Sequence, residues 1–288
     1  MLIQILNAVQ LSMLIFLLAV GLTFIFGIMR VINLAHGALY SLGAYLGVVV
    51  VDATGSFLLA LIVAPLMVAV VGGLLQIFAI GPLTVRGRNE LEIALLTFGL
   101  MYISIGVLET LFGKDYLSIA LPSALAGSVD ILGVSYPLYR LFIIAVGLLT
   151  ALCISLFIER TIVGAAVRAC VDNKPMSESL GMNTDWVLAG VFAVGSGLAA
   201  LGGVIMAPVL SVFPHMGSSI LILSLIVVVI GGMGSLKGSF YGSLIVGLTD
   251  TLTQSYLPQL TMFAVYIILV LVMLTRPHGL FGRHAHSL

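Results

Sequence analysis

The chain has 288 residues, of which 61% are hydrophobic and only 8% are charged, and its 11 basic and 11 acidic residues cancel to a formal net charge of zero. A soluble domain carries about 25% charged residues, so this chain has too few polar side chains to cover a water-facing surface. The neutral balance offers no basic field for nucleic acid, and we expect no nucleic-acid partner. The composition indicates a protein that lies in the lipid bilayer.

Apolar runs bounded by Gly, Pro and charged residues divide the chain into candidate membrane spans. A helix needs about 20 apolar residues to cross the hydrocarbon core. The first run lacks the basic start and the small-residue cleavage site of a signal peptide, so we interpret it as a retained span. The predicted spans cover residues 5–29, 34–51, 56–80, 91–112, 137–158, 186–207 and 260–275.

The region 219–252 differs from these spans, because two apolar pieces are interrupted by the sequence GGMGSLKGS. Each piece is short for a full crossing, so the two form either a tight pair of helices or a re-entrant hairpin. The sequence therefore predicts an all-α polytopic membrane protein with about eight transmembrane helices, within a range of seven to nine. No separate soluble domain is indicated, so residues 1–288 are expected to form a single membrane domain.

The distribution of Lys and Arg predicts the orientation of the chain. Cytoplasmic loops carry an excess of these residues. If the polar segment 159–185 is cytoplasmic, nine of the 11 Lys and Arg lie on that side, and only Lys114 and Arg140 lie outside. We therefore expect the N-terminus outside and the C-terminus in the cytoplasm.

Small residues four positions apart allow two helices to approach closely within lipid. Such residues occur in the second span and around the interrupted region. We interpret them as helix-packing positions: Gly43, Gly47, Gly234, Gly238 and Gly242.

The segment from Glu159 to Asp185, here called the elbow, holds seven of the 22 charged residues of an otherwise apolar chain. We expect a helix over TIVGAAVRAC, a break at DNKP, and a second short helix over PMSESL. Asn173 is the expected N-cap of the second helix and Gly181 its C-terminal glycine. Thr184 or Asp185 is expected to cap the following span.

Two interpretations of the elbow stay open at this point. Its short helix either lies in a groove of another protein, or it connects two spans and packs on its own membrane domain. For the docking interpretation, the apolar contact residues would be Val167, Met176 and Leu180.

The sequence VRACVDNKPMSESLGMNTDWVLAGVFAVGSGLAALGGV resembles the cytoplasmic loop and following helix of the LivH/LivM-type permeases, the membrane subunits of branched-chain amino acid ABC transporters. Two more stretches, GLTFIFGIMRVINLAHGALYSLGAY and GGMGSLKGSFYGSLIVG, resemble the same family in the same order. The INLAHG sequence is nearer to the LivH half of the usual pair. The resemblance implies an ATPase-coupling loop with these residues: Gly164, Arg168, Ala169, Asn173, Leu180, Gly181 and Asp185.

The same resemblance implies a set of partners in the bacterial cytoplasmic (inner) membrane. The chain would form half of a pore, completed by a second, LivM-like permease subunit. ATP and Mg are expected on two partner ABC ATPase subunits, and an extracytoplasmic substrate-binding protein would deliver a branched-chain or similar small amino acid. Family members that handle amides, urea or aromatic acids share these motifs, so the solute stays open, as does the choice between a heterodimer and a homodimer of permeases.

Polar side chains in RVINLAHG lie at membrane depth, where they are costly unless they face protein or a watery path. They either line the route of a solute or satisfy a broken helix backbone and hold two helices together. Two residues of the fourth span extend the set on weaker grounds. The candidate translocation path consists of Asn33, His36, Tyr40, Thr97 and Tyr102.

No Ser-His-Asp arrangement or metal-ligand spacing occurs, and GGMGSLKG lacks the spacing of a phosphate-binding loop. We therefore expect no catalytic residue, no metal, no cofactor bound by this chain and no enzyme activity. The alternative function is a stand-alone secondary transporter or channel. Ion-coupled carriers commonly place Asp, Glu or His at mid-membrane, and here the spans offer mainly His36, with Glu109 near an end.

Overall fold

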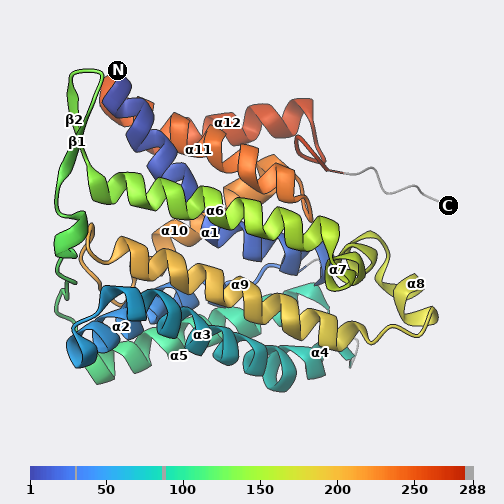
Figure 1. Cartoon of the computed structure of the whole chain (residues 1–288). Helices are drawn as coiled ribbons and strands as arrows, with labels where there is room; N and C mark the ends of the chain where they lie inside the picture. The colour runs from blue at the N-terminus through green and yellow to red at the C-terminus, as the bar shows by residue number, and fades with distance from the viewer. Residues whose placement is uncertain (30, 86–88, 283–288) are drawn as a thin grey trace.

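The computed structural model describes residues 1–29, 31–85 and 89–282. The long helices run side by side in one bundle, with a β-hairpin at one end and two short helices at the other (Figure 1). Within the described ranges, seven helices are long and apolar enough to cross a membrane. The prediction of an all-α polytopic membrane protein is therefore confirmed.

The boundaries of the helices follow the predicted spans within a few residues. The third span continues through a π-helical turn, η1 (Gln76–Ile80), into a short helix. Two 3-10 turns, η2 (Ser123–Leu125) and η3 (Pro258–Leu260), lie in the connections. The α-helices are α1 (Leu2–Met29), α2 (Ala35–Thr54), α3 (Phe57–Leu75), α4 (Gly81–Val85), α5 (Glu90–Phe112), α6 (Leu138–Arg160), α7 (Ile162–Asp172), α8 (Lys174–Ser179), α9 (Thr184–Met206), α10 (Met216–Gly231), α11 (Leu236–Tyr256) and α12 (Thr261–Thr275).

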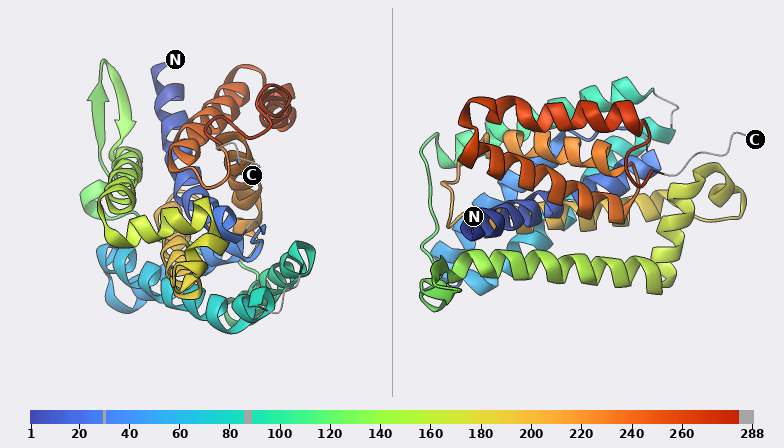
Figure 2. Two further views of the ribbon diagram at one scale, coloured as in Figure 1. Left: turned by 90° about the vertical axis from the view of Figure 1, so that its right-hand side faces the viewer. Right: turned by 90° about the horizontal axis from the view of Figure 1, so that it is seen from above.

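Helix α1 lies at the centre of the bundle and is buried along most of its length. A helix that is apolar all round is stable only when other helices surround it or lipid covers it; here α9, α10, α11 and α6 pack around it. By contrast, α3, α6 and α12 expose much of their apolar surface, which suits contact with lipid. Figure 2 shows α3 and α5 on one side of the bundle and α11 and α12 on the other.

The interrupted region near the C-terminus forms a pair of helices, α10 and α11, joined by residues 232–235. Helix α11 contains more small and polar residues than the spans, and several of these residues face the interior of the bundle. Ser239 and Ser243 are buried, and the Ser239 hydroxyl lies 2.6 Å from the Thr23 hydroxyl of α1. Both predicted pieces are thus helical and pack against each other, and the choice between two crossing helices and a re-entrant hairpin stays open.

A β-hairpin in the connection between α5 and α6 was not predicted from the sequence. Strands β1 (Ser128–Ile131) and β2 (Val134–Pro137) pair antiparallel. The hairpin is tied to the start of α1, because Asn7 Oδ1 accepts hydrogen bonds from the Tyr136 hydroxyl at 3.1 Å and from Arg140 Nη1 at 2.6 Å. Strands of four residues are too short to produce a recognisable alternation in the sequence.

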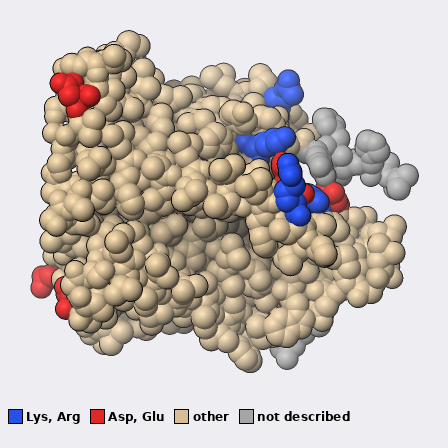
Figure 3. Space-filling view, in the orientation of Figure 1, with Lys and Arg blue, Asp and Glu red and all other residues tan. Residues whose placement is uncertain are grey.

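The two ends of the bundle differ in charge. On the face shown in Figure 3, Lys and Arg side chains gather at the end that holds α7 and α8, here called the elbow end. Among the described residues, Lys114 and Arg140 belong to the opposite, hairpin end. The predicted basic positions Arg30, Arg86, Arg88 and Arg283 lie outside the described residues. The elbow end holds Arg160, Arg168, Lys174, Lys237 and Arg276.

Candidate functional site

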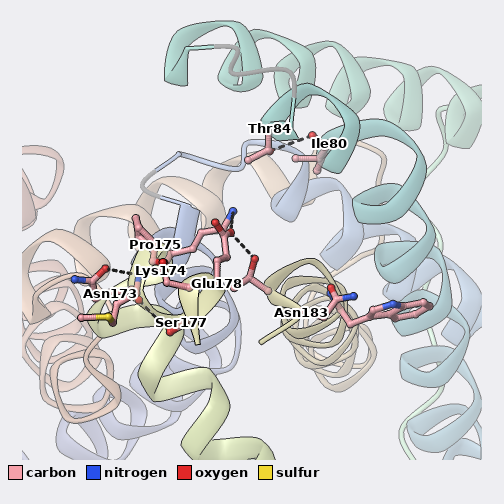
Figure 4. Close-up of polar contacts among 12 residues, drawn as sticks. Ile80, Thr84, Asn173, Lys174, Pro175, Ser177, Glu178 and Asn183 are labelled. Carbon is pink, nitrogen blue, oxygen red and sulfur yellow. Dashed lines mark hydrogen bonds and ion pairs between the residues drawn. The ribbon is translucent and has the colours of Figure 1, made fainter. Parts of the chain in front are cut away.

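The elbow consists of two short helices held by local caps (Figure 4). Thr161 separates α6 from α7, and its hydroxyl accepts a hydrogen bond from the Gly164 amide at 2.9 Å. Asn173 separates α7 from α8 in the same way, because its side-chain oxygen accepts from the Met176 amide at 3.0 Å. Pro175 lies in the first turn of α8, where its missing N–H costs nothing. The predicted break at DNKP is confirmed.

Gly181 ends the second elbow helix in the left-handed conformation, with φ of +84°. Its amide donates to the Glu178 carbonyl at 2.9 Å, and the Met182 amide donates to the Ser177 carbonyl at 3.0 Å. These bonds satisfy carbonyls that the end of a helix leaves free. No neighbouring atom lies within 4 Å of a Cβ placed on Gly181, so the backbone conformation alone favours glycine there.

The predicted cap of α9 was wrong by one residue. Asn183, rather than Thr184 or Asp185, is the N-cap, and its Oδ1 accepts from the Trp186 amide at 3.2 Å. Thr184 is instead the first residue of α9, and its hydroxyl donates to Glu178 Oε1 at 2.7 Å. Asp185 lies in the first helical turn, where its charge suits the positive end of the helix dipole.

The Glu178 carboxylate connects α8 to α9. Besides the bond from Thr184, it lies 3.8 Å from Lys174 Nζ, one helical turn back in α8. A partly exposed i,i+4 ion pair of this kind contributes at most about 1 kcal/mol. Its structural effect is to hold α8 in one position relative to the start of α9.

The elbow turns one face inward and leaves another exposed. Val167 and Cys170 are buried, so Val167 packs against its own bundle and is not available to a partner. Met176 is 58% exposed and Leu180 is 76% exposed. Two of the three predicted contact residues therefore form an exposed apolar pair on α8 and the turn after it.

The implied coupling residues are distributed over both elbow helices. Gly164 packs against backbone carbonyls at the end of α6, which leaves no room for a side chain. Ala169 is half-buried on α7. Arg168 is also half-buried, and its buried Nη1 has no hydrogen-bond partner among the described residues. Asp185 is exposed.

The inner face of α7 contacts two other elements at one point. A Cβ placed on Gly234 would lie 2.6 Å from Cγ1 of Val171, and one on Gly27 would lie 2.7 Å from Cα of Gly234 and 3.3 Å from the same Cγ1. Gly234 precedes α11 in the connection from α10, with φ of +76°. It therefore lies outside the helix in which Gly238 and Gly242 pack, and it joins α7, α1 and the α10–α11 pair.

The other packing glycines lie at helix contacts. Gly43 and Gly47 of α2 face Ala200 and Val204 of α9. In α11, Gly238 packs on Gly231 at the end of α10, and Gly242 packs on Val227 and Gly231 of the same helix.

Two of the candidate path residues, Thr97 and His36, lie beside residues 31–34, the non-helical connection between α1 and α2. Thr97 of α5 supports this non-helical backbone: its hydroxyl accepts from the Leu34 amide at 3.1 Å, and its single proton can go either to the Ala94 carbonyl of its own helix at 2.9 Å or to the Ile32 carbonyl at 3.4 Å. His36 Nε2 lies 3.2 Å from the Leu18 carbonyl in the middle of α1. The Thr97 contacts satisfy non-helical backbone and the His36 contact joins α2 to α1, so both match the packing interpretation.

The remaining path candidates lie in different surroundings. Tyr40 is buried against α9, beside Gly202 and Gly203. Tyr102 is 53% exposed. Asn33 is buried, and neither atom of its side-chain amide has a hydrogen-bond partner within the described part of the chain. Asn33 is therefore the path candidate whose side chain makes no hydrogen bond that would explain its burial; His36 also leaves its buried Nδ1 without a partner among the described residues, but its Nε2 contacts Leu18.

Several contacts of this site could not be predicted from the sequence. The pairs Thr97–Leu34 and His36–Leu18 join residues from different helices, and no short motif encodes them. Within the described residues, no group of three or more His, Cys, Asp or Glu is placed to hold a metal ion.

Residues 4–273 match the protein family described as the permease component of branched-chain amino acid transport systems. The chain belongs to this permease family. It is 32% identical to the LivH high-affinity branched-chain amino acid transport permease of Salmonella typhimurium and 31% identical to that of Escherichia coli K12, over 97% of this chain and 95% of each relative. It is 28% identical to the BraD permease of Pseudomonas aeruginosa, with the same coverage. No solved structure matches the chain. The permease is a multi-pass membrane protein and a transporter component rather than an enzyme.

Proposed function

We propose that this permease is one of the two membrane subunits of an ABC importer for branched-chain or similar small amino acids. Its relatives are named as permeases of branched-chain amino acid transport. The observation that carries the proposal is the elbow: a capped short helix at the basic end of the bundle, with Met176 and Leu180 exposed beside the Gly181 turn.

The elbow end is the cytoplasmic end in this proposal, because five described Lys and Arg residues lie there and two lie at the hairpin end. The N-terminus is then outside and the C-terminus is in the cytoplasm. Two ABC ATPase subunits bind and hydrolyse ATP with Mg, and the Met176–Leu180 pair inserts into a groove on one of them. A second permease subunit completes the pore, and an extracytoplasmic binding protein delivers the solute at the hairpin end. The permease itself binds no cofactor.

Closure of the ATPase pair moves the elbow, and the Val171–Gly234–Gly27 contact passes this movement to α1 and the α10–α11 pair. Asn33 supplies a polar surface for the solute when the helices separate. Two observations support this sequence of events. The elbow is capped at each turn and so moves as a rigid piece, and the Asn33 amide is buried without a partner among the described residues, which is costly unless it serves a function.

The experiment that tests the proposal is reconstitution. The tagged permease is purified in mild detergent with the chains that accompany it, and the preparation is placed in proteoliposomes. We expect a second permease, ATPase subunits, and uptake of radiolabelled leucine that requires both ATP and the binding protein. Uptake driven by a proton or sodium gradient without ATP would contradict the proposal and support the secondary transporter, with His36 as the first residue to replace.

A further inference from the structure

An apolar groove of about 430 Å³ lies between α6 and α9, in the half of the bundle nearest the elbow. Its floor is the close contact of α1 and α9, where a Cβ on Gly21 would lie 2.6 Å from Cα of Gly195. Its walls come from membrane-spanning helices, and α7 closes the elbow side with Val163 and Val167. Nearly all of its lining is apolar, so it offers no contacts to a polar solute.

Charge at the mouth of the groove is one-sided. On α6, Arg160 continues the row of Cys153 and Phe157, which line the groove, because residues at i, i+4 and i+7 share a helix face. Arg160 is exposed, and no ion pair joins it to another described residue. By the same helical spacing, Glu159 and Asp185 lie on the faces of α6 and α9 that point away from the groove-lining residues.

Trp186 stands on the α9 wall at the same level of the bundle. It is 69% exposed, lines the groove and is the only tryptophan of the chain. Tryptophan is enriched where the hydrocarbon core meets the lipid headgroups. The mouth of the groove, with the Arg160 cation and the Trp186 ring, is thus expected at the level of the lipid headgroups, and the groove extends from there into the apolar interior of the bundle.

A membrane offers two kinds of apolar occupant for this groove, a lipid acyl chain and the apolar face of a partner helix. Both occupants would be apolar, but only the lipid also places an anionic phosphate beside the cation at the mouth.

We propose that the groove binds an acyl chain of an anionic membrane phospholipid, whose phosphate lies beside Arg160. The bound chain fills the space between α6 and α9 next to the elbow. This proposal requires that the chain lies in a membrane but does not depend on the transported solute. Failure of the importer proposal would therefore not refute it, and its own failure would not refute the importer proposal.

The test uses Trp186 as the reporter. The full chain is delipidated in detergent and titrated with phosphatidylglycerol that carries brominated acyl chains, which quench tryptophan emission on contact. We expect saturable quenching at about one lipid per chain. Val194→Phe, which fills the groove from an exposed position on α9, abolishes the saturable part; Val107→Phe, at a similarly exposed position on α5, leaves it unchanged.

Arg160→Gln tests the headgroup contact. We expect the affinity for brominated phosphatidylglycerol to fall about fivefold, the effect of one basic residue near an anionic lipid, while binding of brominated phosphatidylcholine stays the same. Gly190→Phe is a second filling variant if Val194→Phe fails to fold, since no atom lies within 4 Å of a Cβ at Gly190. Quenching that rises without saturation, or that is equal in both filling variants and the unmodified chain, overturns the proposal.

Cys153 distinguishes lipid from a partner helix. It lines the groove and is exposed, whereas Cys170 is buried. In the assembled complex, a lipophilic maleimide should modify Cys153 after delipidation and more slowly after phosphatidylglycerol is restored. Protection of Cys153 that survives delipidation and ends only when the partner permease is removed would show that a helix occupies the groove, and would contradict the lipid proposal.

Discussion

Val171 of the elbow rests directly on Gly234, the glycine that precedes α11: a Cβ at position 234 would lie 2.6 Å from Cγ1 of Val171. Real Cβ atoms do not approach other carbons this closely, so one of the two must move when the other gains an atom. The elbow and the α10–α11 pair are thus in direct contact, and in the proposed mechanism a displacement of α7 reaches α11 through this pair.

Replacing Gly234 with alanine tests this contact. We expect Gly234→Ala to raise the ATP hydrolysed per solute transported by about 2- to 30-fold, corresponding to about 0.5–2 kcal/mol of coupling energy. The double variant Gly234→Ala with Val171→Ala removes the clashing Cγ1 and should recover most of the coupling. Gly55→Ala is the control for backbone strain, because Gly55 has a similar φ of +68° and no atom near its Cβ. A Gly234→Ala complex with normal coupling would refute the relay through this contact.

Gly181→Val tests the turn after α8. Valine resists the left-handed conformation, at a cost of about 1–3 kcal/mol, so α8 should shift or unwind while the permease still inserts into the membrane. We expect normal expression, continued ATPase activity and loss of ATP-driven uptake, measured in proteoliposomes. Gly55→Val imposes the same strain at the hairpin end and should keep uptake. Full transport by Gly181→Val at normal expression would remove the elbow from the coupling mechanism.

Asn33→Leu separates the path interpretation from the packing interpretation. The Asn33 amide is buried without a partner among the described residues, so an apolar residue of similar size should raise stability by about 1–3 kcal/mol, seen as a higher Tm in detergent. If Asn33 also serves the solute, uptake falls in the same variant. A destabilised Asn33→Leu protein would show that Asn33 holds the helices together instead.

The two cysteines should differ in reactivity. Burial raises the pKa of the Cys170 thiol, the nearby charges of Lys174 and Glu178 having smaller effects, so less thiolate is present at any given pH than for an ordinary cysteine. At pH 8 we expect maleimide to modify only Cys153 in the folded, delipidated permease, and a Cys153→Ala variant to remain unlabelled until it is unfolded in SDS. Labelling of Cys170 in the folded protein would contradict the inward position of this face of α7.

The sequence predicted features that depend on neighbours along the chain. Charge-free runs located the spans because a membrane crossing imposes length and composition on one continuous segment. The Asn173 cap and the Gly181 turn were predicted because a cap is formed by a side chain or a glycine within three residues of its partners. Asn183 was missed as the cap of α9 because Thr184 and Asp185 are equally good caps by residue type, and only the position of the first helical residue distinguishes them.

Features that depend on residues far apart in the chain could not be predicted. Thr97 supports the backbone of residues 32–34 across more than 60 positions. Gly234 looks like a third member of the Gly238 and Gly242 series, yet its positive φ places it before the helix. The groove between α6 and α9 could not be predicted from the sequence. Both helices are apolar on all sides, so the pattern does not show which of their residues line a groove.

Contact between the elbow and an ATPase is the central claim, and a photo-crosslinking amino acid placed at Leu180 tests it most directly. The matched control is the same amino acid at Leu132, which is even more exposed but lies in the hairpin at the opposite end. After illumination of membranes that hold the complex, we expect an adduct between position 180 and an ATP-binding subunit, and none from position 132. Adducts from position 180 only with lipid or with the permease itself, in a complex that still transports, would contradict the claim.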